Sequence, residues 1–242
     1  MKSIIKKPIF YIILAATAYR FIGVFYNLGH DFFGDSFVHV VAAFKMFEEK
    51  TINATFDFYY LPPLMSYIIA PFFAVFGVTG MLIGKFSGID GFRDFVLLNK
   101  EYFVLGPRLV SALLGAGSVY LIYLLTKRIF DEKTAVIAAI FLTFDFYHIH
   151  ESHSGRIWAP ITFFIIVSLY AVWRIFESEL TNWRFYETEE SKEKWYILGA
   201  VAIGLGYGMG YVPILMYPWF AAVHLLKNKA IRIRDVYLDQ KF

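Results

Sequence analysis

The fold is decided by residues 104–126, which read VLGPRLVSALLGAGSVYLIYLLT. The run holds one charged side chain, Arg108, and as a helix it is long enough to cross a hydrocarbon core of about 30 Å, which needs roughly 20 residues. A spanning segment must satisfy its own backbone hydrogen bonds, so a run of this kind forms a helix. Further apolar runs lie at 8–26, 62–84, 134–150, 157–173 and 195–227. The sequence therefore predicts an all-α, polytopic membrane helix bundle.

Composition supports this class. The 242 residues are 58% hydrophobic and 20% aromatic, whereas soluble domains are about 45–50% apolar. The net charge of +3 is too small to indicate a nucleic-acid partner. The chain has no cysteine, which excludes disulfides, a thiolate nucleophile and a cysteine-type zinc site.

The last apolar run has too many residues for one span. Its 195–227 stretch would make about 50 Å of helix at 1.5 Å per residue, and Gly206, Gly210 and Pro213 offer a place to turn. We interpret it as a hairpin of spans 195–211 and 213–227.

The basic residues predict the topology. With 8–26 as an uncleaved signal anchor, a cytoplasmic N-terminus and 62–84 lying in the outer interface or re-entering it, about twice as many Lys and Arg residues fall inside as outside. If 62–84 crosses, the excess reverses, against the positive-inside rule. We therefore expect six spans, and a first outer loop that carries interfacial helices.

Two polar segments then share the outer face. The first leads to Asp35, where Asp35 or Ser36 caps an amphipathic helix over 35–49. Asp35 is either a helix cap at the membrane surface or a general base that deprotonates an acceptor hydroxyl. Asp31 and His30 are the alternatives for its role.

The second segment, 145–156, contains three histidines, two acids and an arginine at a helix end. We expect Glu151 to act in catalysis and His150, His153 and Arg156 to bind substrate. His150, Glu151 and His153 could instead hold a divalent metal, although their spacing is not that of zinc proteases.

The order of Asp35, Leu61-Pro62-Pro63-Leu64 and Arg108–Gly115 resembles the N-terminal part of the GT-C membrane glycosyltransferases. The branch of protein O-mannosyltransferases and aminoarabinose transferases is the most similar, over residues 8–225. This resemblance implies that Asp35 is the base and that His39 matches a histidine one turn later, which we expect to bind substrate. Arg108 could supply a charge for the polyprenyl phosphate, because a bidentate guanidinium suits phosphate oxygens. A snorkelling role at the interface is the plainer interpretation of Arg108.

The chain departs from that family at three places. Ser36 stands where a second carboxylate is expected, Tyr59–Leu61 lacks a lysine found in relatives, and Trp158 and Pro160 occupy a stretch that often carries an acid. Glu151 would substitute for that acid.

The resemblance implies a single transmembrane module over 1–242 that forms the N-terminal part of a longer protein. Its function would be inverting transfer of a sugar from a polyprenyl-phosphate donor to a protein, lipid or glycan acceptor. The site would face the outside of a prokaryotic plasma membrane or the lumen of the endoplasmic reticulum. A transporter or flippase subunit is the alternative, because outer acids and histidines also serve as ligands there, and a non-catalytic membrane scaffold is another.

Overall fold

The computed structural model describes residues 8–26, 28, 35–53, 62–181 and 190–225. These residues contain helices and no strand, which confirms the all-α class. The helices are α1 (Pro8–Val24), α2 (Asp35–Glu48), α3 (Leu64–Leu82), α4 (Ile89–Leu98), α5 (Lys100–Phe103), α6 (Leu105–Ile129), α7 (Glu132–Phe144), α8 (Phe146–His153), α9 (Trp158–Thr181), α10 (Glu190–Met209) and the 3₁₀ helix η1 (Val212–Met216).

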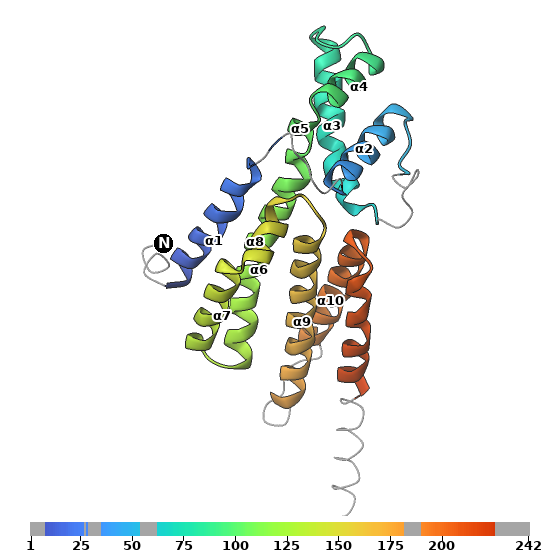
Figure 1. Ribbon diagram of the computed structural model, residues 1–242. Coiled ribbons are helices and arrows are strands. Elements are labelled where there is room, and N and C mark those ends of the chain that lie inside the picture. The colour runs from blue at the N-terminus through green and yellow to red at the C-terminus, as the bar shows by residue number, and fades with distance from the viewer. Residues whose placement is uncertain (1–7, 27, 29–34, 54–61, 182–189, 226–242) are drawn as a thin grey trace, which may run out of the picture.

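The bundle is built around α6. Helices α1, α7 and α9 each pack along α6, and α10 packs on the far side of α9 (Figure 1). Three helices in the described part of the chain are long and apolar enough to cross a membrane: Leu64–Leu82, Lys100–Ile129 and Trp158–Glu177. Helix α1 is also apolar but shorter.

The run predicted as a hairpin turns after α10. An added Cβ at Gly199 would collide with the ring of Phe220, and one at Gly206 would lie 2.9 Å from Pro213 Cβ. Gly199, in the middle of α10, thus contacts Phe220, and Gly206, near the end of α10, contacts Pro213, which comes before Phe220 in the chain. The chain after the turn runs back along α10. The apolar helix Val212–Leu225 therefore lies antiparallel to α10.

A second group of helices lies at one end of the bundle, where α2, α3 and α4 gather beyond α9 (Figure 1). Its core is aromatic, with Phe92 fully buried and its ring centroid 5.1 Å from that of Phe86. Phe44 and Phe73 also contact Phe92. Helix α4 lies in the predicted first outer loop, where interfacial helices were expected without bounds for this one. Helix α3, the apolar run 62–84, belongs to this group, and its interfacial position stays a prediction.

The run predicted as one span over 134–150 is two helices. Helix α7 ends at Phe144, and α8 starts after Asp145, whose extended backbone (φ −62°, ψ 113°) breaks the helix. The Asp145 carboxylate then accepts a hydrogen bond from His148 N at 2.6 Å, which caps α8. A new helix start is favoured there because Asp satisfies the unpaired N–H groups of a first turn.

Helix α8 sits against α6 at a glycine. An added Cβ at Gly115 would lie 2.8 Å from Ser152 Cβ and 3.4 Å from Arg20 Cδ. The absence of a side chain at Gly115 is therefore what lets α1, α6 and α8 approach one another.

We predict that Gly115→Ala destabilises the protein by about 1–3 kcal/mol, the usual cost of overpacking a tight core. The matched control is Gly204→Ala on α10, where an added Cβ meets nothing within 4 Å. Removing a mid-helix glycine there should leave stability unchanged or raise it by about 0.5–1 kcal/mol. Thermal unfolding in detergent measures both, and equal melting temperatures for the two variants would contradict the proposed contact.

Candidate active site

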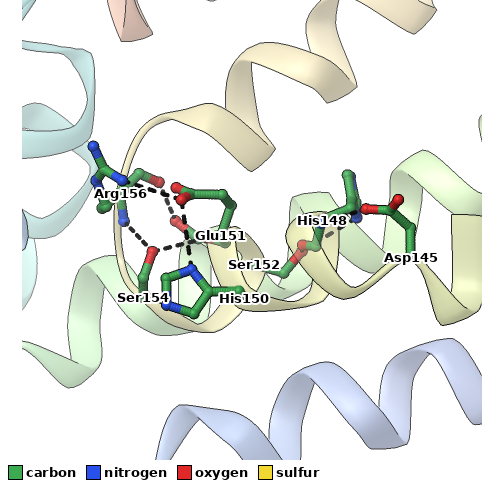
Figure 2. Close-up of polar contacts among 8 residues, drawn as sticks. Asp145, His148, His150, Glu151, Ser152, Ser154 and Arg156 are labelled. Carbon is green, nitrogen blue, oxygen red and sulfur yellow. Dashed lines mark hydrogen bonds and ion pairs between the residues drawn. The ribbon is translucent and has the colours of Figure 1, made fainter.

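The site lies at the end of the bundle where α8 turns into α9. Figure 2 shows Glu151, His150, Ser154 and Arg156 gathered on one side of α8, with Asp145, His148 and Ser152 on the other. The turn between the helices passes through Gly155 at φ +76°, a left-handed conformation that glycine adopts without strain.

An ion pair forms the centre of the site. Arg156 Nη1 donates to Glu151 Oε1 at 3.1 Å, and His150 Nδ1 lies 3.5 Å from the same oxygen. The Glu151 side chain is 3% exposed, against 21% for Arg156 and 34% for His150. In the described part of the chain, Glu151 Oε2 is buried without a hydrogen-bond partner. Arg156 and His150 are thus the members of the group that a ligand can reach.

The backbone of the turn is fixed by hydroxyl groups. Ser154 Oγ donates to Glu151 O at 3.1 Å and accepts from Arg156 N at 3.3 Å. Ser111 Oγ on α6 donates to Arg156 O at 2.9 Å. These bonds hold the ion pair against α6, so the direction of the Arg156 side chain is set by the core of the bundle.

Arg108 is buried, which makes the snorkelling interpretation wrong. Its side chain is turned inward, and Nη1 donates to Val24 O at 3.0 Å and to Tyr26 O at 2.9 Å. These carbonyls lie at the C-terminal end of α1, where a helix leaves its last carbonyls unpaired. Arg108 therefore caps α1.

Three distant segments meet beside Arg108. An added Cβ at Gly155 would lie 3.0 Å from both Arg108 Cγ and Ser36 Cβ. The first turn of α2, which begins at Asp35, thus touches the α8–α9 turn and the start of α6. The two polar segments that the sequence predicted on one face are adjacent here.

For Asp35, the predicted base, the structure gives the position of the backbone. Asp35 is the first residue of α2, while its side chain, like His30 and Asp31, lies outside the described part of the structure. His39, one turn further, is 2% exposed, and its Nδ1 lies 3.3 Å from Ser66 Oγ on α3. It joins α2 to α3.

His153 lies apart from the ion pair. An added Cβ at Gly23 would collide with its ring, and in the described residues its buried Nδ1 has no hydrogen-bond partner. Burial lowers the pKa of the His153 imidazole to about 4, and the neighbouring groups His150, Arg108 and Arg20 contribute to the shift in the same direction. Among the residues that the structure covers, no group of three His, Asp or Glu side chains converges as metal ligands. The metal set His150, Glu151 and His153 is therefore not formed.

Arg20 and His148 form a buried hydrogen-bonded pair beside the site, and the sequence did not predict this pairing. Arg20 is fully buried in α1, and its Nη2 donates to Leu142 O at 2.9 Å and to His148 Nδ1 at 2.8 Å. Nη1 donates to Ala16 O at 3.2 Å. Because a guanidinium only donates, His148 accepts at Nδ1 and carries its proton on Nε2. A charge within an apolar run was the available signal.

Apolar helices of membrane length and a polar site at their ends define an integral membrane protein. A family model described as dolichyl-phosphate-mannose-protein mannosyltransferase matches residues 15–230, which extend from α1 past η1. The chain belongs to this family, which confirms the resemblance seen in the sequence. The protein is therefore a membrane glycosyltransferase that uses a lipid-linked sugar donor. No curated protein and no solved structure matches the chain.

We predict that acid destabilises the protein partly through His153. Its pKa is about 4 in the folded chain and about 6.5 when unfolded, so between these values the unfolded chain binds the extra proton and stability falls as pH is lowered. Above pH 6.5 this contribution to stability is fully present. His153→Gln should flatten the dependence of melting temperature on pH between about 6.5 and 4. Parallel curves for wild type and variant would assign the acid sensitivity to other groups.

Proposed function

We propose that the protein transfers a sugar from a polyprenyl-phosphate donor to an acceptor hydroxyl, with inversion at the anomeric carbon. The observation that carries this proposal is the meeting of Ser36, Arg108 and Gly155. It brings the start of α2, where Asp35 lies, beside the turn that holds Glu151 and Arg156. A base and a phosphate-binding cation are then available at one place.

The reaction needs one proton transfer and one substitution. The Asp35 carboxylate takes the proton from the acceptor hydroxyl as its oxygen attacks the anomeric carbon. The bond between that carbon and the phosphate oxygen breaks on the opposite side, and the lipid phosphate leaves with the electron pair. Attack from the face opposite the leaving group inverts the sugar.

Arg156 is the favoured cation for the donor phosphate. It is partly exposed and held in direction by Glu151 and the turn, and a guanidinium suits phosphate oxygens through paired N–H donors. Arg108 is the second candidate, since one of its nitrogens already holds the end of α1.

The remaining predicted site residues divide by exposure. Glu151 is buried against Arg156, so we propose that it orients Arg156 and acts on catalysis through it. His150 is open enough to contact the sugar or the acceptor. His39 and His153 are packed between helices, which favours a positioning role for both.

The family description supports mannose as the sugar and a protein as the acceptor, and lipid and glycan acceptors stay as alternatives. The distribution of basic residues supports a cytoplasmic N-terminus and a site on the extracytoplasmic face.

Asp35→Asn tests the base. We expect turnover to fall by about 10²–10⁴-fold, the usual contribution of a general base, while folding and donor binding persist because Asn also caps a helix. The matched control is Asp131→Asn, which changes a helix-capping aspartate that accepts from Thr134 N at 2.7 Å at the start of α7. Sugar transfer in membranes containing each variant measures the effect. Near wild-type transfer by Asp35→Asn would leave Asp35 as a helix cap.

Arg156→Ala tests the phosphate site. Loss of a charge-assisted hydrogen bond of about 1.5–3 kcal/mol should weaken binding of a polyprenyl phosphate by about 10–150-fold. Arg93→Ala is the control, because Arg93 is also an ion-paired arginine, 3.1 Å from Glu48, but lies on α4. Arg156→Lys distinguishes a phosphate ligand from a residue that only anchors α9 at the membrane interface. An anchor tolerates lysine, whereas a ligand that binds phosphate through paired N–H donors does not. Unchanged affinity in both Arg156 variants would leave Arg108 as the phosphate ligand.

A further inference from the structure

A groove of about 650 Å³ lies between α1, α6 and α9, away from the proposed active site. One wall is apolar and comes from α1, through Ile9, Phe10 and Ile13. The facing wall is a single stripe of α6 that includes Tyr120 and ends in Lys127 and Arg128. Residues three, four and seven apart share one face of a helix, so these side chains point into the groove together.

The cations of the groove lie about one membrane thickness from the site. Lys127 follows Arg108 by 19 positions on α6, which is about 29 Å of helix at 1.5 Å per residue. A hydrocarbon core is about 30 Å thick. If α6 spans the bilayer, Lys127 and Arg128 therefore lie at the interface opposite the candidate active site.

Each of the two cations is only partly engaged within the described residues. Lys127 Nζ lies 2.8 Å from Glu132 Oε2 and 3.4 Å from Tyr123 Oη. Among the residues that the structure describes, Arg128 is bound to Glu177 Oε1 alone, at 3.4 Å. Lysine has three N–H donors and arginine five, and both side chains are more than two-fifths exposed. Donors thus remain for a further anion.

The charge around the groove favours an anion. Glu177 is shared between two arginines, because Arg128 contacts its Oε1 and Arg174 Nε lies 3.6 Å from its Oε2. In these three ion pairs of the described residues, Lys127, Arg128 and Arg174 share two carboxylates, Glu132 and Glu177. In the part of the chain that the structure describes, the hydroxyls of Tyr120 and Tyr170, which also line the groove, make no hydrogen bond.

We propose that this groove binds an anionic phospholipid, with the phosphate at Lys127 and Arg128 and an acyl chain along the apolar wall of α1. Apolar wall, tyrosine hydroxyls and cations in one groove match the chemistry of a lipid at its headgroup and upper chain. Basic pockets between membrane helices are known to hold anionic headgroups. The site is independent of the transferase reaction, and it would join α1 to the α6–α9 pair through the lipid.

Lipid-dependent thermal unfolding tests the proposal. The whole chain, purified in an uncharged detergent, is titrated with phosphatidylglycerol or phosphatidylcholine of identical acyl chains, and the five tryptophans report unfolding. Phosphatidylglycerol should raise the melting temperature more than phosphatidylcholine. The double change Lys127→Gln and Arg128→Gln should weaken the apparent affinity for phosphatidylglycerol by about tenfold or more.

Two further variants keep the test decisive. Ile13→Trp fills the groove without changing charge, so it should also reduce the lipid effect, even if the double variant does not fold. The control Lys85→Gln and Arg93→Gln removes two cations outside the groove and should keep the wild-type response. Equal stabilisation by the two lipids, an unchanged response in the groove variants, or the same stabilisation by inorganic phosphate alone would each overturn the proposal.

Discussion

Carbonyl oxygens at helix ends are the constraint on which this structure depends. A helix leaves its last four carbonyls unpaired, and in a bilayer no water replaces the missing donors. Two buried arginines supply them: Arg108 donates to Val24 O and Tyr26 O after α1, and Arg20 donates to Leu142 O near the end of α7. The helix ends can therefore lie inside the protein, where the candidate site is.

This arrangement explains why the site is assembled from turns. The break at Asp145 allows α8 to start in a new direction, and the turn at Gly155 reverses the chain into α9. Between them, Glu151 and Arg156 are held by hydrogen bonds to their own turn and to Ser111. These bonds fix the direction of the Arg156 side chain before any ligand arrives, which suits the phosphate-binding role proposed for it.

The sequence predicted the elements whose signals are local. Long apolar runs correspond to α1, α6 and α9, and the amphipathic pattern after Asp35 corresponds to α2. The break between α7 and α8 was not predicted, because Phe146, Tyr147 and Ile149 continue the apolar run past Asp145. The bounds of α4 were not predicted, although Phe92 and Val96, one turn apart, are both buried.

Side-chain partners were harder to predict than helices. Arg108 was expected at the lipid interface, and its inward direction depends on the end of α1, more than eighty residues earlier. Arg20 stands out in the sequence as a charge within the apolar run 8–26, but its partners Leu142 and His148 are set by tertiary packing alone. The proximity of α2 to 145–156 was predicted from shared topology, whereas the contact of Ser36 with Gly155 requires coordinates.

The burial of Arg20 also bears on how the chain is made. Its partner Leu142 follows 122 residues later, and at about 5–20 residues per second of synthesis the ribosome takes roughly 6–24 s to reach it. During that time α1 must hold a guanidinium in or near the lipid, at a cost of up to about 2.5–3.5 kcal/mol on insertion scales. The bonds of Arg20 to Leu142 and His148 can form only after α7 and α8 have been synthesised, so α1 reaches its final packing later than its place in the chain suggests.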